Sequence, residues 1–273
     1  MSDCSKTTSI IEIKKETDNY TTIFIENNLE KHIHLKQFNP GQFVMLWVPR
    51  VDEKPFGISY IDEKRIGITY EVKGRFTKKL SELKVGDLIG IRGPYGNGYP
   101  NIDENTVIVA GGCGIAPLAP LVEKHAKIKN VIIGGRSKEF TLFKNRFSGA
   151  TFTTDDGTYG GKGFVTVPLK KLLDTENVTK VLCCGPEIMM QNVINLCNEY
   201  NVECFISIER YMKCGFGICG QCVCGDKVVC KEGPIFNAKD IKENEEFNKS
   251  ARLKSGKKVE LKEYYEYRTK PQS

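Results

Sequence analysis

The most informative stretch of this 273-residue chain is Cys214-Gly-Phe-Gly-Ile-Cys219-Gly-Gln-Cys222-Val-Cys224-Gly-Asp-Lys-Val-Val-Cys230. Five of the eleven cysteines lie in it. Its glycines let a short loop turn sharply and aim several thiols at one place, because glycine reaches positive φ without steric cost. The spacing Cys214-x4-Cys219-x2-Cys222, with Cys230 later, follows the plant-type pattern of a [2Fe–2S] cluster. Cys224 is the thiol left over.

Two other interpretations of these cysteines stay open at this point. A structural zinc ion also takes four thiolates, usually from two C-x2–4-C pairs, and Cys224 with Cys230 would form a poorly spaced second pair. A disulfide loop requires an oxidising compartment.

Composition sets the broad class of the protein. The chain is long enough for two domains, and its 27% charged and 40% hydrophobic residues are ordinary for a globular protein. No apolar run approaches the ~20 residues of a membrane span. The start Met1-Ser-Asp-Cys4 is not a secretory signal, which predicts a reducing cytoplasm. The net charge of +6 comes without a basic-aromatic motif, so we expect neither nucleic acid nor membrane as a partner.

The first third of the chain is predicted to form a small β-barrel. β-branched and aromatic runs at 21–25, 43–48, 66–70 and 85–91 alternate with turn residues. Short strands at this spacing are typical of a closed barrel.

Two barrel segments are candidate ligand sites. The first is Lys54-Pro55-Phe56-Gly57, where a cation can meet a phosphate and an aromatic ring can lie against a flat ligand. The second runs from Thr69-Tyr70-Glu71 to Phe76-Thr77 and leads into an expected short helix at 78–83, whose start would offer an anion site. Turns of both kinds also occur in barrels that bind no ligand.

The middle of the chain is predicted to form an α/β nucleotide-binding domain. An apolar strand at 106–110 runs into Gly111-Gly112-Cys113-Gly114-Ile115-Ala116-Pro117, followed by an expected helix at 118–127. A second strand at 180–184 runs into Gly185-Pro186 and a helix reaching Tyr200. A strand, a glycine turn and a helix let backbone approach a pyrophosphate at the carboxyl end of the sheet.

With these motifs the chain resembles the ferredoxin–NADP⁺ reductase superfamily and, within it, the electron-transfer subunits of NAD-dependent (type B) dihydroorotate dehydrogenases. The resemblance covers about residues 10–241. It is most specific in 111–118, 154–160, 184–190 and the cysteine run with its exit at 230–236.

The resemblance implies a ferredoxin reductase-like fold: an FAD-binding β-barrel (1–100), an NAD-binding α/β domain (101–205) and a small C-terminal [2Fe–2S] domain (206–241). It implies that FAD and NAD contact the candidate residues named above in the barrel segments and the glycine turns. Cys214, Cys219, Cys222 and Cys230 match the four cluster ligands. The implied partner is an FMN-containing catalytic subunit, in a heterotetramer that passes electrons from dihydroorotate to NAD⁺ in pyrimidine biosynthesis.

The chain departs from the family in the barrel. The family usually has arginine, proline, any residue and serine at 54–57, and glycine before the threonine at 77; this chain has Lys54, Gly57 and Phe76 instead. Lysine keeps the charge but loses the bidentate fork of arginine.

Two other functions remain in view. One is an NAD(P)H-oxidising reductase subunit for a ferredoxin-like, hydrogenase or sulfur-reducing partner, and the other is a zinc-stabilised nucleotide-binding regulator. No side chain is expected to act as a catalytic acid or base, because the cofactors carry the chemistry. The charged tail, 242–273, is expected to be mobile or partly helical and solvated, with a docking arm as the alternative.

Overall fold

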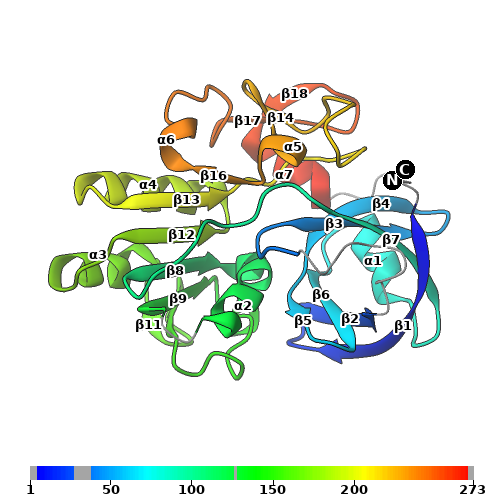
Figure 1. The fold of residues 1–273 in the computed structure, drawn as a ribbon, viewed down its shortest axis with the longest axis horizontal. Coiled ribbons are helices and arrows are strands. Elements are labelled where there is room, and N and C mark those ends of the chain that lie inside the picture. The colour runs from blue at the N-terminus through cyan, green and yellow to red at the C-terminus, as the bar shows by residue number, and fades with distance from the viewer. Residues whose placement is uncertain (1–4, 28–37, 126–127, 270–273) are drawn as a thin grey trace.

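The structure is a computed structural model that describes residues 5–27, 38–125 and 128–269. Its N-terminal part is an antiparallel seven-stranded sheet in the order β4-β3-β7-β1-β2-β6-β5. The sheet curls until β4 lies beside β6 (Figure 1). Its elements are β1 (Lys6–Lys15), β2 (Tyr20–Glu26), β3 (Phe43–Val48), β4 (Asp52–Gly57), β5 (Tyr60–Ile61), β6 (Arg65–Glu71), α1 (Arg75–Ser81) and β7 (Leu88–Tyr95).

The barrel expected from the alternating apolar runs is therefore confirmed. Its interior is filled by side chains such as Ile23, Leu46, Ile68 and Ile91, none more than 1% exposed. One boundary was wrong, because helix α1 begins at Arg75 and not at residue 78. The Thr77 hydroxyl accepts hydrogen bonds from the backbone N–H groups of Lys73 and Gly74, which starts the helix one turn earlier.

The second sheet has the order β11-β10-β9-β8-β12-β13-β16. Its strands are parallel except at the β16 edge, which is antiparallel to β13. Its elements are β8 (Thr106–Gly111), the 3-10 helix η3 (Gly112–Gly114), α2 (Ile115–Lys124), β9 (Asn130–Gly135), η4 (Lys138–Phe140), β10 (Thr151–Thr154), β11 (Gly161–Lys162), α3 (Thr166–Thr175), β12 (Lys180–Cys184), α4 (Glu187–Glu199) and β13 (Glu203–Ser207).

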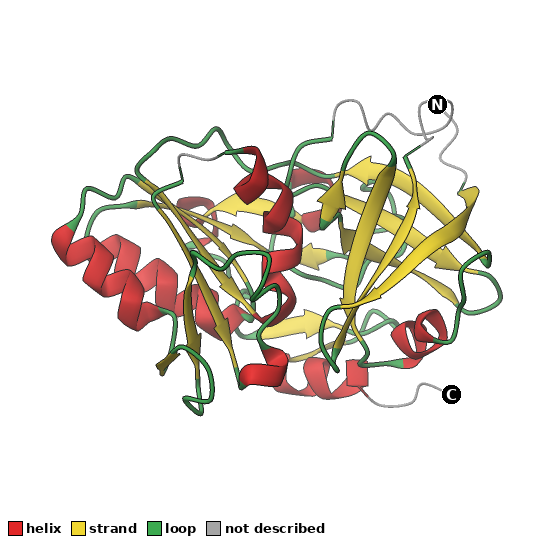
Figure 2. Ribbon diagram, turned by 90° about the horizontal axis from the view of Figure 1, so that it is seen from below, coloured by secondary structure: helices red, strands yellow, loops and turns green. Residues whose placement is uncertain are grey.

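Both faces of this sheet are covered. Alternate residues of β8 point to opposite sides: Val107 and Val109 pack with α3 and α4, whereas Ile108 and Ala110 pack with α2. Helix α2 also contacts β4 and β5, so it lies between the two sheets (Figures 1 and 2). The expected α/β domain is confirmed. Helix α2 begins at Ile115, before the expected residue 118, and residues 126 and 127 lie outside the described part of the chain.

The C-terminal part covers the junction of the two sheets. Its elements are β14 (Val223–Cys224), β15 (Lys227–Val228), α5 (Val229–Glu232), β16 (Ile235–Asn237), α6 (Ala238–Ile241), β17 (Ser250–Arg252), β18 (Lys258–Glu260) and α7 (Leu261–Thr269). The described elements include no helix that is long and apolar enough to span a bilayer. The domain limits at 100, 205 and 241 stay predictions.

The expectation of a partly helical tail is confirmed by α7, but the expectation that the tail is mobile is wrong for residues 244–269, which we call the C-terminal segment. The hairpin β17–β18 and helix α7 enclose a small core in which Ala251, Val259 and Tyr264 are at most 6% exposed. Tyr211, from the loop before the cysteines, packs against this core. The charged composition of the segment hid the fold, because its few apolar residues are spread along the sequence and converge only after the hairpin forms.

Candidate functional site

The four ligand candidates of the cysteine run form two thiol pairs. The backbone N–H of Cys219 donates to Cys214 Sγ at 3.5 Å, and the N–H of Cys230 donates to Cys222 Sγ at 3.3 Å. A third backbone N–H, from Gly217, donates to Cys230 Sγ at 3.1 Å. Gly217 has φ of 90°, a conformation that a side chain would strain, and this conformation turns its N–H inward.

These hydrogen bonds stabilise negative sulfur. Burial opposes ionisation of Cys214, but the N–H groups of Cys219 and Phe216 outweigh it and lower its pKa to about 6. The hydrogen bond between Cys222 and Cys230 lowers the pKa of Cys222 to about 7 and raises that of Cys230. Thiolates are the form that binds metal.

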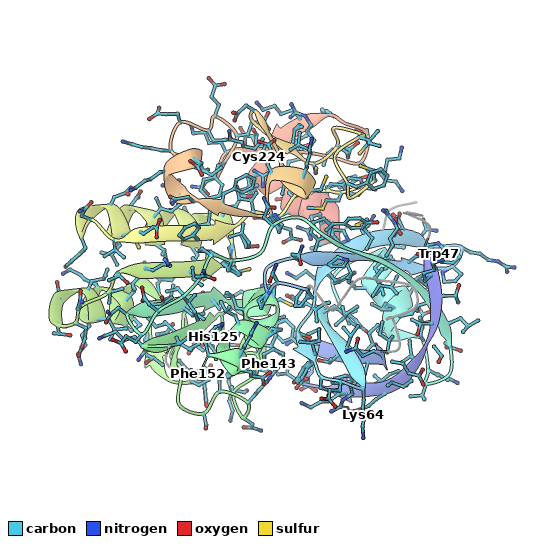
Figure 3. All side chains as sticks on the ribbon, viewed as in Figure 1. Trp47, Lys64, His125, Phe143, Phe152 and Cys224 are labelled. Atoms are coloured by element: carbon cyan, nitrogen blue, oxygen red, sulfur yellow. The ribbon has the colours of Figure 1, made fainter. Side chains whose placement is uncertain are left out.

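The donor set fits a [2Fe–2S] cluster, in which each iron takes two thiolates from the protein. Among the described residues, no three Cys, His, Asp or Glu side chains are grouped so that they could hold a metal ion. Cys224 stands apart from the pairs: it is fully buried in the C-terminal part (Figure 3), and Arg210 Nη2 donates to its sulfur at 3.0 Å.

The two glycine turns meet at the carboxyl ends of the adjacent strands β8 and β12. A Cβ on Gly114 would lie 2.1 Å from the Cys184 carbonyl oxygen, and one on Gly185 would lie 3.1 Å from Gly111 Cα. Only glycine permits this approach of one turn to the other. Gly112 has φ of 56°, and a Cβ there would meet only the Tyr20 hydroxyl, at 3.4 Å.

The structure thus brings the nucleotide-binding candidates together. Gly111, Gly112, Gly114, Gly185 and Pro186 form one edge, and helices α2 and α4 begin at it. Ile115 and Ala116 are buried under the turn, at 0% and 2% exposure, so their side chains serve packing. Backbone that approaches closely and helix N-termini are what a pyrophosphate requires.

The first barrel segment lies on the edge strand β4, where proline is tolerated because one side of the strand needs no N–H donor. Lys54 Nζ donates to Asp52 Oδ2 at 2.6 Å and lies 4.5 Å from the centroid of the Tyr211 ring. Burial lowers the pKa of Lys54, against the effect of Asp52. The Phe56 and Phe76 rings lie 5.8 Å apart. Pro55 stands between Lys54 and Phe56, partly buried like them.

Gly57 joins the barrel to the nucleotide domain. A Cβ at this position would lie 2.5 Å from the Cβ of Pro117 in the first turn of α2. The absence of a side chain at residue 57 therefore sets how closely the two domains pack. No signal in the sequence connects Gly57 with Pro117.

The second barrel segment turns most of its side chains inward. The Thr69 hydroxyl bonds to those of Thr22 and Ser59, each at 2.7 Å, and Tyr70 and Phe76 are 2% and 6% exposed. Burial raises the pKa of Tyr70 to about 12.

What the second segment offers to a ligand is the backbone of β6 and the start of α1. The Thr77 hydroxyl caps α1, and Glu71 pairs with Lys73 at 2.8 Å. The Arg268 carbonyl of α7 packs on Gly74, where a Cβ would be 2.5 Å away. The Thr77 hydroxyl is engaged within α1, and Glu71 and the Arg268 carbonyl are acceptors. The donor that these segments offer to an anionic ligand such as FAD is therefore the ammonium of Lys54, with the Phe56 ring as a flat surface nearby.

Two buried arginines that the sequence interpretation missed hold the cysteine loop. Arg92 of β7 donates from Nη1 to the Cys214 carbonyl at 2.5 Å, and it pairs with Glu53. Arg210 contacts Cys224 and pairs with Glu187. Charged residues are scattered through the whole chain, so nothing in the sequence marks these as buried.

Comparison with known proteins gives consistent matches. A family model described as the iron-sulfur cluster binding domain of dihydroorotate dehydrogenase B matches residues 209–242. A Methanocaldococcus jannaschii protein named as a probable dihydroorotate dehydrogenase B (NAD(+)), electron transfer subunit, is 44% identical over 92% of this chain and 96% of its own length. A Pyrococcus horikoshii protein of the same name is 44% identical over 81% and 87%.

A solved structure extends the likeness to the fold. A chain of the NADH-dependent reduced ferredoxin-NADP oxidoreductase, from a study of flavin-based electron bifurcation, superposes with a TM-score of 0.75 and 26% identity. The match covers 87% of this chain and 90% of that one.

Proposed function

Since this chain belongs to the family of electron-transfer subunits of dihydroorotate dehydrogenase B, we propose that it passes electrons between a catalytic subunit and NAD⁺ by way of a [2Fe–2S] cluster and FAD. The resulting reaction is the oxidation of dihydroorotate in pyrimidine biosynthesis. When bound, FAD exchanges a hydride with the nicotinamide and single electrons with the cluster.

The residues of this chain bind the cofactors and orient them. Cys214, Cys219, Cys222 and Cys230 would hold the cluster, and the backbone N–H groups that donate to their sulfurs would tune its potential. The turns at 111–117 and 185–186 receive the dinucleotide through backbone and helix N-termini.

The barrel would hold the flavin, which exchanges electrons with the groups at the other two sites. Lys54 would supply the positive charge for the flavin phosphates at the edge of β4, and Thr77 would support this region by capping α1. The backbone at 69–71 and the Phe56 ring would contact the flat part of the cofactor.

The partner is an FMN-containing catalytic subunit, and we propose a heterotetramer of two such subunits and two copies of this chain. The ten cysteines of the described residues are all free, which supports a reducing, cytoplasmic location.

The arrangement of four thiols as two pairs with N–H donors is the observation that carries this proposal. An ultraviolet–visible spectrum of protein purified without oxygen tests it, with iron, zinc and flavin quantified on the same sample. About two irons and one FAD per chain are expected. Zinc without flavin would refute the redox function and leave a nucleotide-binding regulator.

The likeness to the ferredoxin-NADP oxidoreductase chain favours a second candidate, an NAD(P)H-oxidising subunit for another partner. The two candidates differ in which protein copurifies and in electron direction. Reduction of the flavin by dihydroorotate in the presence of the copurified partner supports the first. Reduction by NADH alone, with no response to dihydroorotate in that complex, supports the second.

A further inference from the structure

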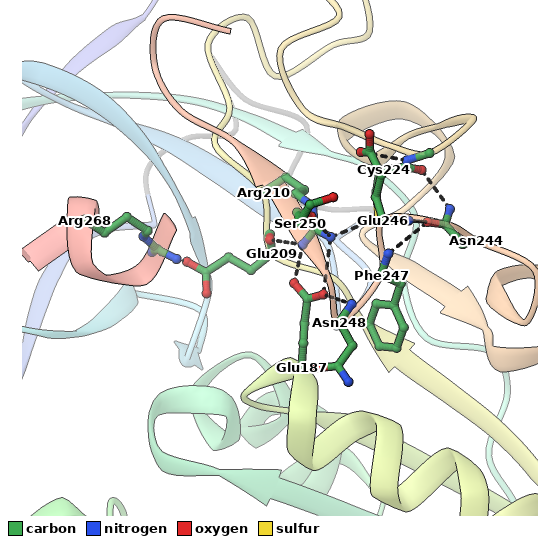
Figure 4. Close-up of polar contacts among 11 residues, drawn as sticks. Glu187, Glu209, Arg210, Cys224, Asn244, Glu246, Phe247, Asn248, Ser250 and Arg268 are labelled. Carbon is green, nitrogen blue, oxygen red and sulfur yellow. Dashed lines mark hydrogen bonds and ion pairs between the residues drawn. The ribbon is translucent and has the colours of Figure 1, made fainter. Parts of the chain in front are cut away.

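A buried ion pair joins the second nucleotide turn to the cysteine loop (Figure 4). Glu187 is the first residue of α4 and follows Gly185-Pro186 directly. Arg210 lies four residues before Cys214. Arg210 Nη1 donates to Glu187 Oε1, and Nη2 donates to Oε2 at 3.3 Å. The two side chains are 1% and 3% exposed.

The same guanidinium reaches two further parts of the chain. Its Nη2 donates to Cys224 Sγ at 3.0 Å, inside the loop that carries the ligand thiols. The C-terminal segment closes the network, because the Asn248 N–H donates to Glu187 Oε2 at 2.7 Å and the Ser250 carbonyl lies 3.5 Å from Arg210 Nη2. One cation therefore links the nucleotide helix, the cysteine loop and the C-terminal segment.

A buried pair of this kind adds little net stability, because both charges lose their hydration. The pair instead fixes the relative position of the two elements that carry it. The planar guanidinium meets the carboxylate on two atoms, which fixes distance and direction together. Moving Glu187 away would leave Arg210 as an uncompensated buried charge. The pair therefore holds the nucleotide turn and the cysteine loop at a constant distance from each other.

We propose that Glu187 and Arg210 are positioning residues that hold the second nucleotide turn and the cysteine loop in register. The inference rests on the proposed function, since it concerns how NAD and the cluster are placed relative to each other. Displacing Glu187 moves Gly185, which packs against Gly111, so both nucleotide turns shift. It also releases Arg210 from Cys224.

The chain contains a matched control. Glu53 and Arg92 form a second largely buried carboxylate–arginine pair, with 22% and 9% exposure. Arg92 Nε donates to Glu53 Oε1 at 2.7 Å, and Nη1 reaches the Cys214 carbonyl. This pair anchors the cysteine loop to the barrel, and among the described residues neither side chain has a hydrogen bond or ion pair with the nucleotide turns.

The experiment compares Glu187→Gln with Glu53→Gln in the full chain. Two quantities are measured: the NAD⁺ dissociation constant of the oxidised protein by calorimetry, and the electron paramagnetic resonance spectrum of the cluster after dithionite reduction. Both variants are expected to shift the cluster spectrum. Only Glu187→Gln is expected to weaken NAD⁺ binding, by about fivefold or more.

A double variant, Glu187→Leu with Arg210→Met, separates positioning from folding. An apolar pair of similar volume removes the uncompensated charge, so the thermal midpoint is expected to rise above that of Glu187→Gln. It lacks the two-atom geometry, so NAD⁺ binding stays weak and the spectrum stays altered.

Three results would overturn the inference. They are an unchanged NAD⁺ constant in Glu187→Gln, an equal loss in both glutamine variants, or recovery of NAD⁺ binding together with the midpoint in the double variant. Wild-type protein with neither cluster nor NAD⁺ binding would instead refute the proposed function, and the inference with it.

Discussion

Replacing Gly57 by serine, the residue that the family resemblance implies at this position, is expected to destabilise this protein. The added Cβ would lie 2.5 Å from Pro117 Cβ and 3.3 Å from Pro117 Cα. Favourable carbon–carbon contacts lie at about 3.5–4.0 Å, so the overlap is about 1 Å. Neither atom can turn away, because one is fixed on strand β4 and the other belongs to a proline ring in α2.

The expected cost follows from overpacking. Forcing extra atoms into a packed interface costs about 1–3 kcal/mol. At about 2–4 °C per kcal/mol for chains near this size, the thermal midpoint should fall by roughly 2–12 °C. Relief by separating the barrel from α2 would also displace the turn at 111–117, so NAD⁺ binding should weaken as well.

Differential scanning calorimetry and NAD⁺ titration measure both effects. Gly57→Ala carries the same Cβ and should behave like Gly57→Ser, whereas Gly149→Ser is the control, because a Cβ there meets nothing within 4 Å. If Gly57→Ser kept the wild-type midpoint and bound FAD more tightly, the reasoning would fail. Serine would then supply a hydroxyl to the flavin.

Three further outcomes test other parts of the structure. Cys219→Ser should abolish the native visible spectrum of the cluster. Cys224→Ser should retain that spectrum, since Cys224 contacts Arg210 and lies outside the two thiol pairs. An intact spectrum in Cys219→Ser would show that Cys219 is not a ligand. In metal-free protein, iodoacetamide labelling of Cys214 should persist as pH falls to about 6, because its lowered pKa keeps it a thiolate. A labelling midpoint near the ordinary value of 9 would contradict the N–H geometry. Tyr264→Ala should destabilise the core of the C-terminal segment by about 3 kcal/mol and speed its proteolysis, and unchanged cleavage would argue against that core.

Much of the fold could be predicted because the signals are local. The β-branched and aromatic runs of the barrel and the strand–glycine–helix units of the second domain depend on residues close in sequence. Boundaries were less accurate. Helix α1 starts at Arg75 because the Thr77 hydroxyl accepts from Lys73 and Gly74, a competition between side chain and backbone that residue type alone does not decide.

The sequence predicted which segments form the candidate site, but it did not predict which of their side chains point into the barrel. Thr69, Tyr70 and Phe76 were chosen for their place in a motif, and the structure puts their side chains inside the barrel. The arginines that hold the cysteine loop were missed. Whether a charge is buried depends on packing among elements far apart in the chain.

The sequence by itself determined the chemistry of this protein: four thiols at cluster spacing, two glycine turns after apolar strands, and a family likeness through most of the chain. Those properties depend on spacing along the chain. The tertiary structure alone decided how the parts are joined, with Gly57 against Pro117, Arg210 between Glu187 and Cys224, and an ordered C-terminal segment across the junction. Each of these contacts joins residues that are distant in sequence, and only the packed chain brings them within reach.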